Sequence, residues 1–166
     1  GYDVGGVIST KQKSTIDNIV RELRNGNREC SISEEKIEVL QAEAKNGKSQ
    51  KDGQKADFYM VRNGVEHFFE IKTVKPNIDI STKSKVKLLE WVARRRTNIE
   101  VFLVFPYNPY HPEPYNRFTL QGLMVPGEDI LIAEEFWDYL GGENTYKQLL
   151  EVFNKVGIEY KGKIAA

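Results

Sequence analysis

Three side chains that could together hold a metal ion and activate water lie in one short stretch of the sequence: Asp57, Glu70 and Lys72. Between them, two runs of aromatic and β-branched residues flank the dipeptide Asn63-Gly64. Asn-Gly between such runs is the strongest short-range signal for a β-hairpin closed by a two-residue type I′ turn. The sequence therefore predicts a hairpin that carries all three side chains.

A two-residue turn also fixes which residues of the two arms face each other. With Arg62 opposite Val65, counting back along both arms places Asp57 opposite Glu70, with Cβ atoms about 5 Å apart. Lys72 projects from the same face, because side chains alternate along a strand. Two opposed carboxylates weaken a sheet unless a cation lies between them. We interpret the pair as a site for a hard divalent cation such as Mg²⁺, which lowers the pKa of a bound water.

The order Asp57, Glu70-Ile71-Lys72 resembles the active-site pattern of the PD-(D/E)xK nuclease superfamily, with Ala56 in place of the proline in that name. Residues 69–77 (Phe-Glu-Ile-Lys-Thr-Val-Lys-Pro-Asn) and 88–93 (Leu-Leu-Glu-Trp-Val-Ala) are similar to type II restriction endonucleases, most closely to a TdeIII-like family. Members of that family are associated with the interrupted palindrome GGNCC. The resemblance is most specific over residues 55–105.

The resemblance implies a restriction-endonuclease-like α/β fold, in which a central mixed β-sheet carries the active-site hairpin and helices flank it. It implies one domain over residues 1–166, with an irregular start (1–9), a catalytic core (10–105) and a loop plus covering helices (106–166). The implied activity is Mg²⁺-dependent hydrolysis of double-stranded DNA at a specific site. Asp57 and Glu70 would hold the metal, and Lys72 would orient the attacking water. A homodimer and a cognate DNA methyltransferase are the implied partners.

Other interpretations of the motif stay open at this stage. Glu-x-Lys occurs by chance, and two more copies are present. Glu34/Lys36 lies in a predicted helix, where residues two apart do not share a face, and Glu159/Lys161 has no acid on a preceding hairpin arm. The charges around Glu70 could belong to an ordinary solvated sheet face. Within the superfamily, a repair or junction-cutting nuclease is the alternative enzyme. A DNA-binding or assembly module without cleavage activity is the alternative from another class.

The composition sets limits on the class of protein. A chain of 166 residues is the size of one domain and is long enough to bury a core. Cys30 is the only cysteine, so no intramolecular disulfide is available and a reducing, cytoplasmic location is expected. No apolar run approaches the ~20 residues of a membrane span.

Formal net charge is zero, but the charges are unevenly distributed. Residues 72–96 contain eight basic and two acidic residues, whereas residues 127–151 contain seven acids and one lysine. A basic strip beside a metal site is typical of a surface that binds a polyphosphate, although two oppositely charged solvated helix faces would also explain it. Lysines at the start of a helix oppose its dipole, which favours phosphate contact as their role. The predicted DNA-binding residues are Lys75, Asn77, Lys83, Lys85, Lys87, Asn108 and Arg117. The Lys- and Gly-rich segment 46–54 is a predicted surface loop that could also touch phosphates.

Two helices are predicted before the hairpin. Apolar residues at helical spacing predict the first over residues 10–25, with Thr10 as its cap. A capping-box pattern at Ser31 predicts the second, to residue 45, buried through Ile37, Leu40 and Ala44. Folds of this type often place a further acid on such a helix, and the sequence does not choose among Glu22, Glu34 and Glu38.

After the hairpin, the pattern predicts a helix over residues 81–96, buried through Leu88, Trp91 and Val92. The apolar run 99–105 predicts a central strand buried on both faces. A short strand near 130–132 and two helices, 134–140 and 145–155, complete the chain. Gly141 and Gly157 are expected to end these helices, which are predicted to cover the sheet.

The loop over residues 106–116 holds four prolines and three tyrosines. Its amide side chains, such as Asn108, and the following Arg117 could reach base edges, since Asn pairs well with adenine and Arg with guanine. A dimer contact and a rigid connector are equally compatible with this composition. His111 is not needed as a catalytic base if a metal and Lys72 already activate the water.

Overall fold

A four-stranded mixed β-sheet organises the computed structural model, which describes residues 1–45, 54–73 and 75–164. Its strands are β3 (Phe58–Arg62), β4 (Val65–Ile71), β5 (Glu100–Phe105) and β6 (Ile130–Ile132), side by side in that order. β3 and β4 are antiparallel, and β4, β5 and β6 are parallel. The predicted α/β class with mixed pairing is thus confirmed. Most of the predicted loop 46–54 lies outside the described residues.

The hairpin has the turn and register that the sequence predicts. Asn63 and Gly64 both have positive φ, 52° and 77°, as a type I′ turn requires. Arg62 pairs with Val65, and the ladder runs back to Phe58 opposite Phe69. Glycine and asparagine tolerate this left-handed backbone better than other residues, so the dipeptide determines the pairing.

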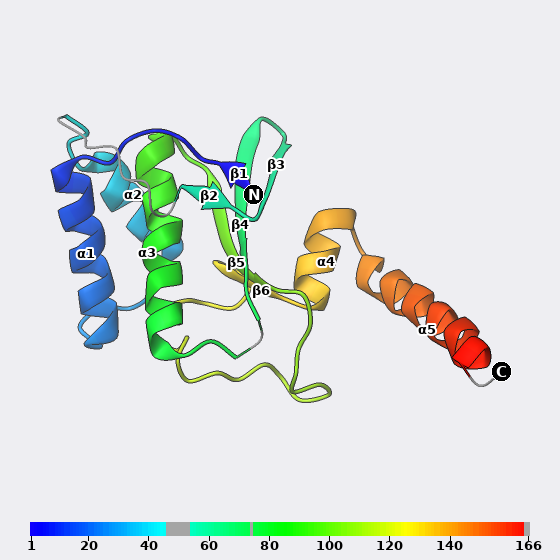
Figure 1. The fold of residues 1–166 in the computed structure, drawn as a ribbon. Helices are drawn as coiled ribbons and strands as arrows, with labels where there is room; N and C mark the ends of the chain where they lie inside the picture. The colour runs from blue at the N-terminus through cyan, green and yellow to red at the C-terminus, as the bar shows by residue number, and fades with distance from the viewer. Residues whose placement is uncertain (46–53, 74, 165–166) are drawn as a thin grey trace.

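Helices cover both faces of the sheet (Figure 1). On one side lie α1 (Thr10–Arg24), α2 (Ile32–Gln41) and α3 (Ile78–Arg95), packed against the buried side chains Phe68, Val101, Leu103 and Phe105. On the other side α4 (Glu134–Gly141) places Phe136 against Phe69, Phe102 and Val104. Strand β5 is therefore buried on both faces, as its unbroken apolar run predicts.

The helix ends differ in detail from the predictions. Ser9, not Thr10, caps α1, because its side chain accepts a hydrogen bond from the backbone N–H of Gln12 in a complete capping box. Helix α2 ends at Gln41, before the predicted residue 45. Its buried side is also different: Ile37 is 54% exposed, whereas Ile32, Glu35, Lys36 and Val39 are buried. The apolar pattern misled here because two charged residues of α2 face the core.

The N-terminal segment is not irregular throughout. Residues Tyr2–Asp3 form β1, which pairs with β2 (Lys55–Ala56) in a separate two-stranded sheet. The ring of Tyr2 stacks on Tyr59 of the hairpin at 3.9 Å between centroids. This contact attaches the chain start to the hairpin arm that leads into the predicted site.

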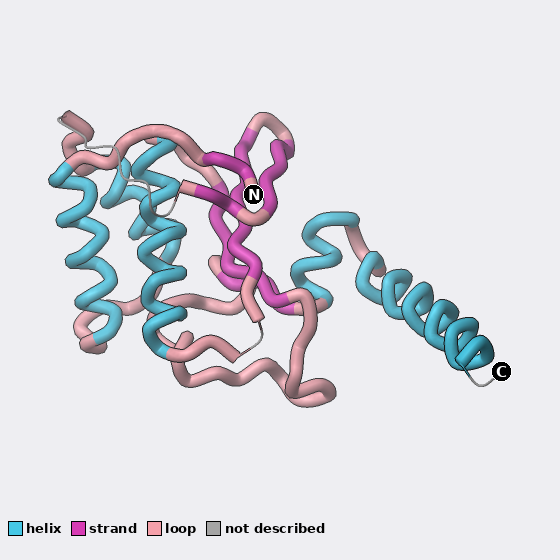
Figure 2. The backbone as a smooth tube through the Cα atoms, viewed as in Figure 1, coloured by secondary structure: helices cyan, strands magenta, loops and turns pink. Residues whose placement is uncertain are grey.

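The last helix is longer than predicted and does not cover the sheet. α5 (Thr145–Ile164) continues through Gly157 and extends from α4 away from the sheet (Figures 1 and 2). Large apolar side chains on it are exposed: Leu150, Val152, Phe153, Val156, Ile158 and Tyr160. Only α4 carries out the predicted covering role. Within the described part of the chain, no helix is long and apolar enough to cross a membrane.

Candidate active site

Glu70 is a buried carboxylate that contacts two lysines. It lies near the end of β4, between β3 and β5, and is 2% exposed. The Nζ atom of Lys72, two residues along the chain, lies 2.5 Å from Oε1 of Glu70. The Nζ atom of Lys87, on α3, contacts Oε2. A buried charge is costly unless it is paired, and here each oxygen of the carboxylate has an ammonium partner.

Asp57 lies beside this group but is not placed as the sequence predicts. The regular ladder ends at Phe58 opposite Phe69, and the backbone N–H of Asp57 also donates to the carbonyl of Phe69, at 2.9 Å. Regular pairing would place Asp57 opposite Glu70, so an irregularity at the strand end breaks the predicted opposition. The Asp57 carboxylate instead accepts a hydrogen bond from the backbone N–H of Ile71 at 2.8 Å. Its side chain is therefore held next to the Glu70-Ile71-Lys72 segment.

A hollow of about 130 Å³ opens between the end of β4 and helix α3. Three lysines and one carboxylate line it, together with Ile80 and Ser84: Glu70, Lys72, Lys83 and Lys87. The α3 residues follow the i, i+3, i+4, i+7 spacing of one helix face. Positive charge is in excess here, so the hollow suits an anion, such as a phosphate, that lies against the carboxylate.

The side chains also fit a hard divalent cation. Asp57 and Glu70 offer carboxylate oxygens, the ligands that Mg²⁺ prefers. The Asp57 side chain is exposed, and its Oδ2 accepts the hydrogen bond from the backbone N–H of Ile71. The other carboxylate oxygen, Oδ1, takes no part in that bond. Both oxygens of Glu70 contact an ammonium, so a cation that binds Glu70 competes with Lys72 and Lys87 for them. These two residues would hold the metal, with Lys72 beside it.

A second cluster of ionisable groups has a different character. Among the described residues, Cys30, Glu35 and Asp129 form the one group of three potential metal ligands. Lys85 lies between the two acids, with Nζ 2.5 Å from Glu35 Oε2 and 2.7 Å from Asp129 Oδ2, and all three side chains are fully buried. The ammonium takes the place that a metal would occupy. The prediction that Lys85 contacts DNA is therefore wrong, because its ammonium is buried in the core and paired with two acids.

The chain matches a protein family along almost its whole length. The family model described as type II restriction endonuclease, HinfI, covers residues 1–157. The chain belongs to the HinfI family of type II restriction endonucleases. The TdeIII-like family suggested by the sequence is not the family that this comparison finds, although the enzyme class is the same.

Several type II restriction enzymes are similar to this HinfI-family chain. HgiCII from Herpetosiphon aurantiacus is 28% identical over 170 residues, which cover 98% of this chain and 62% of that protein. MjaII from Methanocaldococcus jannaschii is 28% identical over 166 residues, covering 90% of this chain and 45% of that protein. HgiEI, also from Herpetosiphon aurantiacus, is 26% identical. The chain thus spans less than two thirds of each relative, and no solved structure matches it significantly.

The other predicted DNA-binding residues of this family member differ in whether they line the hollow at Glu70. Lys83 is exposed and lines it. Lys75 is exposed, with Nζ 5.2 Å from the ring centroid of Tyr110. Asn77 is the N-cap of α3, where its side chain accepts from the backbone N–H of Ile80 at 2.8 Å. Its amide thus has a structural role at the start of the helix that carries Lys83 and Lys87.

Asn108 and Arg117 both make contacts within the loop region. The Asn108 amide donates to Glu113 O and accepts from the backbone N–H of Tyr110, each at 2.9 Å, so it organises its own loop. Arg117 donates from Nε to Pro76 O at 3.1 Å, and its guanidinium lies 5.3 Å from the Phe118 ring centroid. Phe118 is 70% exposed. Arg117 therefore lies beside the segment that joins the active-site strand to α3.

The structure does not place a further helix acid in the site. Glu22 and Glu38 both pair with Arg28, and Glu34 is exposed at the start of α2. None of the three lines the hollow at Glu70 among the described residues. What the sequence missed is the contact of Lys87 with Glu70, whose signal was the position of Lys87 on the same helix face as Ile80 and Lys83.

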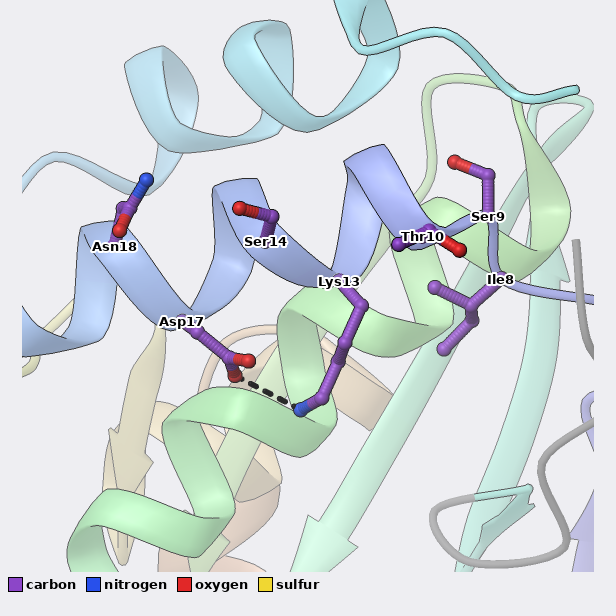
Figure 3. A pocket seen from close by; sticks show the side chains of 7 residues that line it. All are labelled: Ile8, Ser9, Thr10, Lys13, Ser14, Asp17 and Asn18. Carbon is purple, nitrogen blue, oxygen red and sulfur yellow. Dashed lines mark ion pairs between the residues drawn. The ribbon is translucent and has the colours of Figure 1, made fainter.

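A larger hollow lies along α1, but its chemistry is different (Figure 3). It has a volume of about 330 Å³ and is lined by residues of α1 and the segment before it. Lys13 pairs there with Asp17 at 2.9 Å and with Glu90 at 3.2 Å. Its one lysine is thus already paired with two acids, and neither Asp57 nor Glu70 lines the hollow, so we do not assign it a catalytic role.

Proposed function

We propose that this chain carries the active site of a Mg²⁺-dependent endonuclease that hydrolyses phosphodiester bonds of double-stranded DNA at a specific site. The observation that carries the proposal is the buried Glu70 carboxylate, paired with Lys72 and Lys87 and lying beside Asp57 at a basic hollow. Membership of a restriction-endonuclease family supports DNA as the substrate. The relatives that the chain matches are named as type II restriction enzymes.

Each residue of the site has a role in this proposal. Asp57 and Glu70 hold the metal, which when bound polarises the phosphoryl group and favours ionisation of the attacking water. Lys72, half-buried directly after the end of β4, orients the water and offsets the charge that develops on the phosphate in the transition state. Lys83, on the wall of the hollow, holds the phosphate. Cleavage that follows the superfamily leaves a 5′-phosphate and a 3′-hydroxyl.

We further propose an interrupted palindrome of the GGNCC type as the target, which rests on the sequence resemblance. Arg117 is the best-placed described residue for base recognition, because it is anchored at Pro76 next to the active-site strand. Arg pairs in a bidentate manner with guanine in the major groove. Asn108 contributes by shaping the loop over residues 106–116, since its amide is already used within the loop.

A homodimer is proposed because one site cuts one strand and a palindrome has two equivalent strands. Helix α5, with its exposed apolar side chains, is the surface in the described part of the chain that best supports a contact with a second copy. The loop over residues 106–116 stays the alternative interface. A restriction endonuclease also needs a cognate DNA methyltransferase to protect host DNA, and we propose one as the functional partner.

The direct test incubates the purified chain with plasmid and Mg²⁺ and maps the ends of any product by sequencing. Discrete fragments with a common end sequence are expected, and Lys72→Ala protein prepared in parallel should give none. Binding without cleavage in Mg²⁺ would favour the non-catalytic DNA-binding module. Cutting that depends on DNA structure rather than on sequence would favour a repair or junction nuclease.

The dimer has its own test. Mixing wild-type protein with the Lys72→Ala variant should give heterodimers that nick one strand of a plasmid, so open-circular DNA should accumulate. Sedimentation on target DNA measures the assembly directly. A monomer on DNA, with only linear and uncut plasmid from the mixture, would exclude the dimer.

A further inference from the structure

The two lysines that contact Glu70 come from different elements. Lys72 lies two residues along the chain, directly after the end of β4, with Nζ 2.5 Å from Oε1. Lys87 reaches Oε2 from α3, and its Nζ also lies 5.4 Å from the ring centroid of the buried Trp91. The Lys87 side chain is 24% exposed, so it borders the hollow rather than being enclosed.

Each carboxylate oxygen of Glu70 is therefore in contact with a lysine ammonium. A divalent cation that binds Glu70 must therefore displace at least one of them or share an oxygen with it, and like charges at such short range repel strongly. Lys72 is tethered beside Glu70 by the strand. Lys87 has a long flexible stem on a separate helix, and it borders a hollow into which its ammonium can move.

We propose that Lys87 is a positioning residue that competes with the divalent cation for Oε2 of Glu70 and, once displaced, binds the DNA phosphate in the hollow. This inference rests on the proposed function, because it takes Glu70 as a metal ligand and DNA as the anion. It assigns Lys87 a role different from a simple surface contact to phosphate: the residue acts through Glu70 on metal binding.

The competition has a thermodynamic consequence. A phosphate in the hollow draws Lys87 away from Glu70 and so makes Oε2 available to the metal. Metal on Glu70 releases Lys87 for the phosphate. Each ligand therefore raises the affinity for the other, and the two enhancements are equal by linkage. Because of Lys87, the protein bound to DNA should bind the metal more tightly than the free protein does.

The first experiment measures Ca²⁺ binding to the free protein by titration calorimetry. Ca²⁺ takes oxygen ligands but accepts looser geometry than Mg²⁺, so it is expected to bind without supporting cleavage. Lys87→Gln and Lys87→Met should bind Ca²⁺ about three- to tenfold more tightly than wild type, because a competing charge has been removed. Lys87→Arg should stay close to wild type. Lys75→Gln, which removes an exposed charge that does not contact Glu70, is the matched control and should leave the Ca²⁺ affinity unchanged.

The second experiment measures DNA affinity by fluorescence anisotropy with and without Ca²⁺. In wild type, Ca²⁺ should increase DNA affinity by on the order of tenfold. In Lys87→Gln this increase should shrink to about threefold or less. Lys75→Gln should weaken DNA binding equally in both conditions, so its increase should equal that of wild type. Circular dichroism checks that each variant is folded. If Lys87→Gln is not folded, Lys87→Met takes its place, because methionine keeps an apolar stem like that of lysine.

The outcomes separate this inference from the proposed function. If the folded Lys87 variants bind Ca²⁺ with wild-type or lower affinity while the wild-type enzyme still cuts DNA in Mg²⁺, the competition is refuted and the function stands. If wild type does not cut but the variants bind Ca²⁺ more tightly, the competition stands and the function fails. An unchanged Ca²⁺ effect on DNA affinity in Lys87→Gln would refute the release of Lys87 to phosphate.

Discussion

Two of the three lysines of helix α3, Lys85 and Lys87, differ in their exposure to solvent and in the charges around them. Residues two apart on a helix point to nearly opposite faces, about 200° apart. Lys85 enters the core and is fully buried between Glu35 and Asp129, whereas Lys87 is 24% exposed at the edge of a hollow and contacts Glu70. In sequence the two residues look alike, and the charge pattern predicts phosphate contact for both.

The two clusters have opposite charge balances. Around Lys85, one ammonium lies between two carboxylates, so the buried group has no positive charge to offer a ligand. Around Glu70, one carboxylate lies between two ammoniums, with Lys83 on the same wall. We call the group at the hollow (Glu70, Lys72, Lys83 and Lys87) the open cluster and the buried group (Lys85, Glu35 and Asp129) the closed cluster. The open cluster has an excess of positive charge beside solvent and so attracts an anion, whereas the closed cluster can affect only the stability of the fold. The comparison predicts that changes at Glu70 act on chemistry and changes at Lys85 act on stability.

The largest effect is expected at the open cluster. Asp57→Ala, Glu70→Ala and Lys72→Ala should each reduce plasmid cleavage by roughly 10³-fold or more, because a metal ligand or a charge at the phosphate contributes several kcal/mol to the transition state. Chemical denaturation should show little loss of stability for Asp57→Ala and Lys72→Ala, whose side chains are exposed or half-buried. Near-normal turnover by any of these variants would remove that residue from the mechanism.

The next largest effect is expected at the closed cluster. Lys85→Met should lower the free energy of unfolding by about 3–5 kcal/mol, because it leaves Glu35 and Asp129 buried without their common partner. Urea denaturation measures the loss. The pKa of Lys85 supports the same expectation: burial would lower it, but the charges of Asp129 and Glu35 outweigh this and raise it above 10.5. The stabilisation is therefore fully present below pH 10.5 and lost as pH rises further.

Lys87→Met sharpens this comparison as the matched variant two residues away. It removes the same charge from the same helix but leaves Glu70 paired with Lys72, so its stability loss should be clearly smaller. Equal losses in the two variants would mean that the open cluster is as important for the fold as the closed one.

The sequence determines the hairpin more completely than the site on it. Asn63-Gly64 specifies the turn through backbone conformation, which is local, so register and pairing could be predicted. The break of the ladder at Asp57 could not, because it depends on how the arm leaves the sheet toward β2. The burial of Glu35 and Lys85 was hidden for a different reason: charged residues enter a core only when partners from distant parts of the chain meet there. Gly157 did not end α5, since a glycine inside a helix costs only about 1 kcal/mol.

Cys30 provides a chemical probe of the closed cluster. Its Sγ lies 3.0 Å from the Leu123 carbonyl and 3.6 Å from Lys85 Nζ. Burial raises the pKa of this thiol from 9.0 to about 12, although the charge of Lys85 opposes the shift. Because the thiolate is the reactive form, alkylation by iodoacetamide at pH 8 should be roughly 10²-fold slower in the folded protein than in guanidinium.

The pH dependence of the alkylation rate shows in which direction the pKa of the Cys30 thiol is shifted. In the folded protein the alkylation rate should keep rising above pH 9, where an ordinary thiol would level off. The folded thiol keeps its proton while the unfolded thiol loses it, so the contribution of Cys30 to stability falls as pH rises from 9 toward 12. A rate that levels off near pH 9 would show that the cluster is open to solvent.

The smallest effect is expected for exposed lysines near the open cluster. Lys83 lines the hollow and Lys75 lies exposed before α3, so each is proposed to contact one DNA phosphate. Binding a phosphate releases counterions, so removing one lysine that binds a phosphate should reduce the log–log slope of DNA affinity against salt by about one. Lys83→Ala and Lys75→Ala should thus each lower the slope by about one, and together by about two. The buried Lys85, measured as a folded Lys85→Met variant, should leave the slope unchanged because its charge never reaches the DNA. A reduced slope for Lys85→Met with intact slopes for the other two would reverse the assignment of open and closed clusters.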